Sequence, residues 1–152
     1  LENPIALDKI CSTMANKFSE DSIDLVVGAA IGGILLAGGV GKYLSTKHIF
    51  SERVNGKMKF RRGFNIEKGS KILIVEDIVS TGGSIVELIN LLNEYGANII
   101  GIICIVNRNQ KNIVYKCRFE SLLNFPSESW KENECPEWLL KIPIVKPGST
   151  GK

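Results

Sequence analysis

The sequence predicts an α/β protein in which helices flank an open, Rossmann-like parallel sheet. Short apolar runs rich in β-branched residues occur at 23–28, 72–75 and 99–106, as is typical of strands buried on both faces. Segments with helical spacing of apolar residues alternate with these runs, which is the order expected of a parallel sheet. With 152 residues, of which 44% are apolar, the chain is long enough for one domain with a full core, so we expect 1–152 to form a single domain.

The composition argues against several classes of protein. A net charge of +3 is too small to predict a nucleic-acid partner, and the longest apolar stretch, 26–40, is broken by glycines and cannot span a bilayer. Cys11 and Cys104 lie in apolar segments, where free cysteine behaves as a small hydrophobic residue. We therefore expect a reduced, cytoplasmic protein with no membrane partner.

The amino-terminal part predicts a helix, a strand, a glycine-rich loop and a second helix. Asn3 and Pro4 make a cap and first-turn pair, and apolar residues then recur at helical spacing. After the strand at 23–28, the small residues of 28–33 would let the main chain approach a ligand, although a plain strand-to-helix turn has the same composition. The segment 34–44 is apolar nearly all round, which predicts a buried, closely packed helix.

A basic segment follows a weakly alternating strand at 47–52. Arg and Lys residues recur through 53–62 around the turn signal Asn55-Gly56, which predicts a hairpin-like arm. Two interpretations remain open at this point. The arm is either a solvated basic loop or a mobile element that brings cations to a leaving group that gains negative charge. His48, the single histidine, is expected to be structural because no second ligand or nucleophile lies near it in sequence.

The central segment 72–84 combines a strand, two carboxylates and a loop rich in hydroxyl groups and glycine. Ser84 and Glu87 predict a capping box at the start of the following helix. Backbone N–H groups at such a loop-to-helix junction bind phosphate, so 80–84 is a candidate phosphate cradle. Glu76 and Asp77 would repel a phosphate, so the ligand must also offer sugar hydroxyls, a bridging Mg²⁺ or a cationic transition state.

The carboxyl-terminal part adds a buried strand at 99–106 and a further strand or two within 115–125. Arg108 stands where the strand at 99–106 ends, and its guanidinium there is either a surface cation or a bidentate partner for a carboxylate. Trp130, Trp138 and Ile142 make the tail at 125–152 too apolar for a free linker. We expect this tail to pack on the domain.

The segment 72–84 resembles the phosphoribosyl pyrophosphate (PRPP) binding motif of type I phosphoribosyltransferases, and 29–33 resembles the loop that binds pyrophosphate in that family. The arm, Arg108 and the Pro-Gly-Ser run at 147–149 are similar to those of orotate phosphoribosyltransferases. The resemblance implies the type I phosphoribosyltransferase fold with a flexible β-hairpin arm. It also implies Mg²⁺-dependent transfer of the phosphoribosyl group from PRPP to orotate in pyrimidine biosynthesis, by a homodimer.

The resemblance also implies roles for individual residues. It assigns catalysis to the arm and to the acidic pair, through Arg53, Lys57, Glu76 and Asp77. Ser80 and Arg108 are expected to contact orotate, and Mg²⁺ is expected to be held mainly by PRPP, with Asp77 as the candidate contact from the chain. The residues expected to bind PRPP are Ala30, Ile31, Gly32, Arg53, Lys57, Lys59, Glu76, Asp77, Ile78, Val79, Ser80, Thr81, Gly82, Gly83 and Ser84.

One departure leaves the choice of base open. Family members usually carry an additional amino-terminal segment that forms a hood over the base, and this sequence begins after it. Transfer to another base therefore remains an alternative, as does a PRPP-binding regulator without catalysis. A purine enzyme would be expected to have an aromatic stacking residue in the loop after 106, and 107–110 has none.

Overall fold

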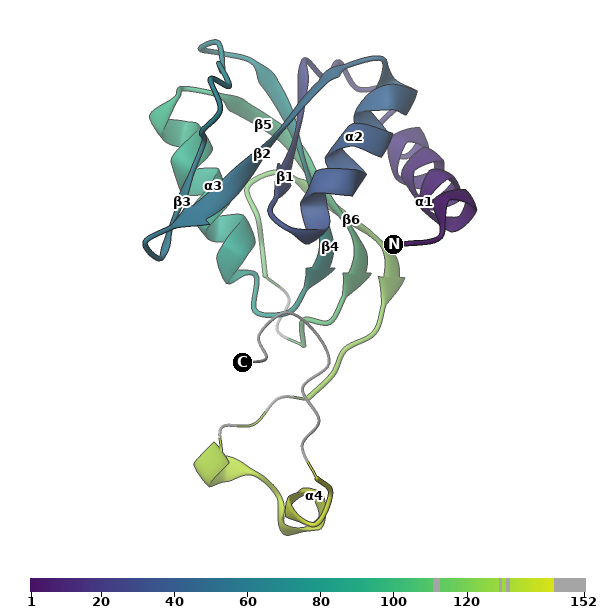
Figure 1. The fold of residues 1–152 in the computed structure, drawn as a ribbon, viewed down its shortest axis with the longest axis vertical. Helices are drawn as coiled ribbons and strands as arrows, with labels where there is room; N and C mark the ends of the chain where they lie inside the picture. The colour runs from purple at the N-terminus through teal and green to yellow at the C-terminus, as the bar shows by residue number, and fades with distance from the viewer. Residues whose placement is uncertain (111–112, 129, 131, 144–152) are drawn as a thin grey trace.

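The protein folds as a six-stranded sheet with helices on both faces, in the strand order β3-β2-β1-β4-β5-β6 (Figure 1). This computed structural model describes residues 1–110, 113–128, 130 and 132–143. The elements are α1 (Pro4–Asn16), β1 (Leu25–Ala29), α2 (Gly32–Leu44), β2 (Lys47–Val54), β3 (Lys57–Lys59), β4 (Lys71–Val79), α3 (Gly83–Glu94), β5 (Asn98–Asn107), β6 (Arg118–Asn124), the 3-10 turn η1 (Glu132–Glu134) and α4 (Glu137–Leu140).

Five of the strands run parallel, and β3 pairs antiparallel with β2. At the centre of the sheet, Val27 of β1 is in register with Ile49 of β2 and Ile74 of β4. The carboxyl ends of β1, β4, β5 and β6 therefore lie along one edge, where ligands bind in open α/β sheets. The predicted α/β fold with an open parallel sheet is confirmed.

The packing of the central strand β4 explains its four consecutive apolar residues at 72–75. Ile72 and Ile74 pack in the core cluster that includes the inner face of α3, whereas Leu73 and Val75 pack in the cluster formed with α1 and α2. Alternate side chains of a strand point to opposite faces, so a strand covered on both faces is apolar at every position. Figure 1 shows this layering, with α3 on one side of the sheet and α1 and α2 on the other.

The two helices on the α1/α2 face are in close contact, as the glycines of 34–44 predicted. A Cβ atom added at Gly39 of α2 would lie 2.3 Å from Cys11 Sγ of α1. Both of these positions must therefore stay small or adaptable for the helices to approach this closely.

Several predicted boundaries differ from those in the structure. Glu76 and Asp77 lie inside β4, which continues to Val79, because β4 pairs with β5 beyond the apolar run. The predicted capping box is wrong: Gly82, with φ of 74°, is the N-cap of α3, and α3 has no side-chain cap. Glu87 instead accepts hydrogen bonds from the Arg53 guanidinium of β2 and from the backbone N–H of Met58 in β3.

The start of the tail is bonded to the domain, because Phe125 N donates to Asn107 O at 2.8 Å. The later part differs from expectation, since Trp138, Leu140 and Ile142 are 62%, 64% and 54% exposed. Trp130 and Trp138 pack edge to face on each other, with ring centroids 6.2 Å apart, and Figure 1 shows α4 projecting away from the sheet. The Pro-Gly-Ser run at 147–149 lies outside the described residues. No helix within the described part of the chain is long and apolar enough to cross a membrane.

Candidate active site

The loops that follow β1, β4 and β5 meet at the carboxyl edge of the sheet. Ala30 N donates to Ser51 O of β2 at 2.9 Å, which holds the first loop against the neighbouring strand. Arg108 N donates to Val79 O at 2.7 Å, and Asn109 Nδ2 donates to Ser80 O at 2.7 Å. The structure thus brings three of the predicted binding segments, 29–33, 76–84 and 107–109, to one edge.

The loop after β1 lies directly against the acidic pair. A Cβ atom added at Gly28 would stand 2.2 Å from Gly33 O, and one added at Gly32 would stand 2.1 Å from Asp77 Oδ2. The peptide between Ala30 and Ile31 is cis. Only glycine fits at Gly28 and Gly32 without moving a neighbour, so the main chain of this loop and the Asp77 carboxylate form adjoining parts of one site.

The two acidic residues differ in environment. Glu76 is 7% exposed, and its burial, together with the neighbouring Asp77 side chain, raises the pKa of Glu76 to about 8. Its carboxyl Oε1 accepts a hydrogen bond from Asp77 N at 3.1 Å. Asp77 is half-buried, and its Oδ1 accepts from Ile78 N at 2.7 Å. Burial therefore favours the protonated form of Glu76, and that form repels a nearby phosphate less than the carboxylate would.

The predicted phosphate cradle forms a small cavity of about 40 Å³, lined by Glu76 and residues 78–85. Gly82 adopts the left-handed conformation that reverses the chain into α3, and Gly83 N donates to Thr81 Oγ1 at 3.4 Å. Because α3 lacks a side-chain cap, the N–H groups of its first turn other than Gly83 N are open to a ligand acceptor. The loop remains the candidate site for a phosphate group.

Tyr115 lies against this cradle, and the sequence did not reveal it. A Cβ atom added at Gly82 would lie 2.6 Å from the Tyr115 hydroxyl oxygen. Within the described residues this hydroxyl is buried without a hydrogen-bond partner, and burial raises its pKa. The sequence signal for a role of Tyr115 was weak, because a tyrosine near Ile113 is ordinary in a segment that packs on a core.

The two residues predicted to contact orotate share one cavity. Ser80 and Arg108 line a space of about 350 Å³ together with Thr81, Asn109 and Ile113. Arg108 Nε donates to Ser127 Oγ at 2.9 Å. That bond holds the Arg108 side chain through Nε. The two outer nitrogens of its guanidinium can then pair with a carboxylate.

The arm is a paired hairpin in the structure, and one of its faces is anchored. Met58 is 8% exposed within the core, and Phe60 packs edge to face on Tyr95 with centroids 5.6 Å apart. Alternation along the strand leaves Lys57 and Lys59 exposed on the other side. The sequence signal for this anchoring is the Lys-Met-Lys-Phe alternation at 57–60.

Arg53 makes the arm's polar contacts. Its Nη2 pairs with Glu87 Oε2 at 2.6 Å, and its Nη1 donates to Gly56 O at 2.6 Å. Arg61 and Arg62 instead pair with Glu52, at 4.0 Å and 2.5 Å. The structure therefore places Arg53 beside the first turns of α3, next to the cradle, whereas Lys57 and Lys59 extend into solvent.

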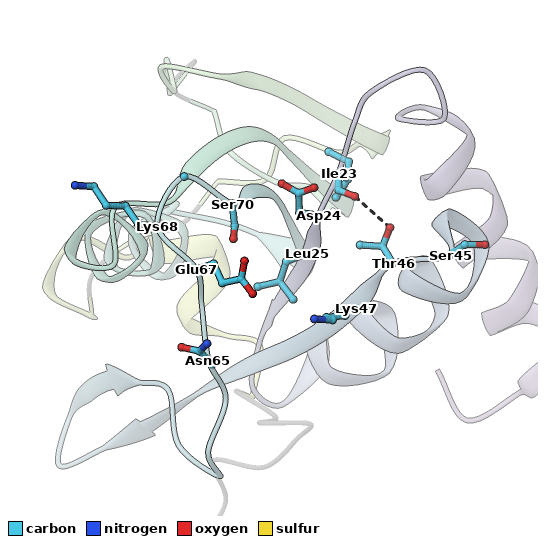
Figure 2. Close-up of a pocket in the computed structure, with 11 residues that line it drawn as sticks. Ile23, Asp24, Leu25, Ser45, Thr46, Lys47, Asn65, Glu67, Lys68 and Ser70 are labelled. Atoms are coloured by element: carbon cyan, nitrogen blue, oxygen red, sulfur yellow. Dashed lines mark hydrogen bonds between the residues drawn. The ribbon is translucent and has the colours of Figure 1, made fainter.

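A larger cavity, about 590 Å³, lies at the opposite edge of the sheet (Figure 2). Asp24, Thr46, Lys47 and Ser70, which lie at or near the starts of β1, β2 and β4, are among its lining residues. Thr46 Oγ1 donates to Ile23 O at 3.3 Å across part of its wall. None of the predicted site residues lies in this cavity, so the chemistry of the carboxyl edge, and not cavity size, identifies the candidate site.

Metal-binding groups are sparse. Among the described residues no group of three or more His, Cys, Asp or Glu side chains could hold a metal ion. His48 lies against α2, where a Cβ atom at Gly41 would be 3.2 Å from His48 Cβ, and this contact is consistent with the structural role expected of it. A divalent cation at this edge would take most of its ligands from a bound phosphate.

Comparisons with known proteins identify the family of this chain. The family model for the phosphoribosyl transferase domain matches residues 1–133. Orotate phosphoribosyltransferase from Thermoanaerobacter sp. (strain X514) is 45% identical over 136 residues, covering 90% of this chain and 72% of the relative. The enzyme of the same name from Caldicellulosiruptor bescii is 40% identical over 152 residues, covering 100% and 80%.

Solved structures show the same fold at lower identity. Adenine phosphoribosyltransferase from Rhodothermus marinus superposes with a TM-score of 0.68 at 20% identity, covering 81% of each chain. UMP synthase from Leishmania donovani also gives a TM-score of 0.68 at 20% identity, covering 80% of this chain and 28% of that one. From the family model and the sequence relatives together, the chain belongs to the phosphoribosyltransferase family and, within it, to the orotate phosphoribosyltransferases.

Proposed function

We propose that the protein transfers the 5-phosphoribosyl group of PRPP to orotate, giving orotidine 5'-phosphate and pyrophosphate in the de novo synthesis of UMP. The observation that carries this proposal is the meeting of four features at one edge of the sheet. They are the glycine loop, the acidic pair, the phosphate cradle, and the cavity lined by Ser80 and Arg108. PRPP offers its pyrophosphate to the loop, its ribose to the acidic pair and its 5-phosphate to the cradle. Orotate offers its carboxylate to the cavity.

In this arrangement the donor lies along the edge of the sheet. The 5-phosphate accepts hydrogen bonds from the N–H groups of 80–84 at the start of α3. The ribose hydroxyls donate to Asp77 and exchange hydrogen bonds with Glu76, whose protonated carboxyl can also donate. The pyrophosphate lies over the main chain of 30–32, within reach of the arm.

The reaction breaks the bond between C1 of the ribose and the pyrophosphate oxygen, and it forms a bond from C1 to the ring nitrogen of orotate. Positive charge develops on the sugar and negative charge on the departing pyrophosphate. The Asp77 carboxylate faces the sugar, and Arg53, Lys57 and Lys59 provide the cations for the leaving group. The base is held by Arg108, whose outer nitrogens can pair bidentately with the orotate carboxylate, and by Ser80.

The residues fit Mg²⁺ as the cofactor. Mg²⁺ is commonly bound through one or two carboxylates and the phosphates of a substrate. Asp77 supplies one accessible carboxylate, and the described residues form no cage of their own. Bound there with PRPP, the ion would neutralise part of the diphosphate charge.

The proposal extends to the assembly and the location of the protein. The protein acts as a homodimer in which the arm serves a neighbouring site. Cys11, Cys104, Cys117 and Cys135 are all free thiols, which supports a reducing cytoplasm.

The test is pyrophosphate release from PRPP and Mg²⁺ with each of orotate, uracil, adenine, guanine and hypoxanthine. Release with orotate alone supports the proposal. Release with another base would reassign the substrate, and PRPP binding without release would indicate a non-catalytic regulator. Arg108→Gln should abolish orotate use while PRPP binding persists, because the base and the donor occupy different parts of the site. Equal loss of both would contradict the role given to Arg108.

A further inference from the structure

Glu87 is committed to the arm although it lies in the first turns of α3. It follows Ser84 of the cradle by one helical turn, so it stands on the same face of the helix. Its Oε1 accepts from Met58 N at 2.8 Å, and its Oε2 accepts from Arg53 Nη2 at 2.6 Å. Both carboxylate oxygens thus bind the hairpin, one through the backbone of β3 and one through a side chain of β2.

These contacts leave Arg53 partly available. A guanidinium has five N–H donors in a rigid plane. Nη2 uses one on Glu87, and Nη1 uses one on Gly56 O at 2.6 Å. Fixing both outer nitrogens fixes the plane of the group, and the remaining N–H donors can still bind oxygens of a ligand. Arg53 is thereby held in one orientation by Glu87 and Gly56 without being saturated.

We propose that Glu87 is a positioning residue that orients Arg53 and the arm for the pyrophosphate departing from the site that the arm serves; this inference rests on the proposed function. A free arginine loses rotamer freedom when it binds an anion, and a group held in place beforehand loses less. The hairpin keeps its other anchors without Glu87, because Met58 is buried in the core and Phe60 packs on Tyr95. Glu87 therefore acts on orientation and not on whether the hairpin forms.

The carboxylate is charged under assay conditions. The Met58 N–H and the Arg53 guanidinium hold the pKa of Glu87 below its usual range. Glu87→Gln keeps the shape and a hydrogen-bond acceptor but removes the charge that holds Arg53. Glu94→Gln is the matched control, because Glu94 is an exposed glutamate at the other end of the same helix.

The experiment is a double-mutant cycle of Glu87→Gln with Arg53→Ala, measured on kcat and KM for PRPP and orotate. Glu87→Gln should lower kcat about fivefold, the scale of a partly exposed ion pair, with KM for orotate unchanged. The same change in the Arg53→Ala background should have no further effect. Glu94→Gln should match the wild type. Additive losses, or a wild-type kcat in Glu87→Gln, would overturn the inference.

A second readout separates this inference from the proposed function. Calorimetry with magnesium pyrophosphate measures anion binding without catalysis, and Glu87→Gln should weaken that binding only when Arg53 is present. If the wild type binds pyrophosphate but transfers nothing to orotate, the proposed function is wrong, and the double-mutant cycle can still be measured on pyrophosphate affinity. Pyrophosphate affinity unaltered by Glu87→Gln would defeat the positioning role.

Discussion

Glu76→Gln tests the unusual environment of the acidic pair. The pKa of Glu76 is raised from 4.5 to about 8, chiefly because the side chain is buried. Between these values the folded protein holds a proton that the unfolded chain releases, so stability falls as pH rises from about 4.5 to about 8. At about 1.36 kcal/mol for each pH unit, the cost of ionising Glu76 above the raised pKa is on the order of 5 kcal/mol.

Glutamine mimics the protonated carboxyl and does not titrate. Unfolding in urea, followed by circular dichroism, should give similar free energies for variant and wild type at about pH 4, below the unfolded pKa. At about pH 9 the variant should be more stable, by an amount on the order of 5 kcal/mol. Parallel stability curves for the two proteins across this range would refute the reasoning.

Glu120→Gln provides a control of opposite sign. Lys17 and then Arg118 hold the pKa of Glu120 below its usual value, although partial desolvation opposes them. A lowered pKa contributes stability above the unfolded value and loses it as pH falls through the folded one. Glu120→Gln should therefore be less stable than wild type at neutral pH, by no more than about 1 kcal/mol because the pair is partly exposed, and equal to it in acid.

Three further predictions follow from contacts at the site and in the core. Gly28→Ala should lose about 1–3 kcal/mol of stability, because its Cβ meets the backbone at Gly33 O. Gly32→Ala should fold with little loss but use PRPP poorly, because its Cβ displaces the Asp77 carboxylate. Urea unfolding and PRPP titration distinguish the two variants, and equal results for both would contradict these contacts. Tyr115→Phe should be as stable as wild type or up to about 1 kcal/mol more stable, since the buried hydroxyl has no partner in the described residues, and a clear loss in thermal unfolding would mean that it has one. Cys104 should react with a thiol reagent only on unfolding, because burial raises its pKa to about 12, and rapid labelling of the native protein would disprove that burial.

The sheet could be predicted because its strands carry a two-sided apolar signal. The run at 72–75 alternates between two cores, and that pattern predicts a central strand covered by helices. The glycine loop and the cradle were also predictable, because both depend on backbone groups and small residues that the sequence displays directly.

The contacts between distant segments could not be predicted in the same way. Ser84 and Glu87 have capping-box spacing, but Arg53 and Met58 N offer Glu87 donors that only the fold brings near. Tyr115 reaches the cradle through packing after β5, which no local pattern encodes. Apolar content alone also does not say whether Trp138 packs on the sheet or on Trp130, and in the structure it packs on Trp130.

Calorimetric titration of the folded protein with PRPP and Mg²⁺, followed by orotate addition and measurement of pyrophosphate, tests the central claim most directly. The account predicts saturable PRPP binding that Asp77→Asn weakens, and pyrophosphate released in equal amount with orotidine 5'-phosphate. If the wild type gives no binding heat with PRPP, or if the Asp77→Asn variant binds PRPP as tightly as the wild type, the donor does not lie at the carboxyl edge of the sheet.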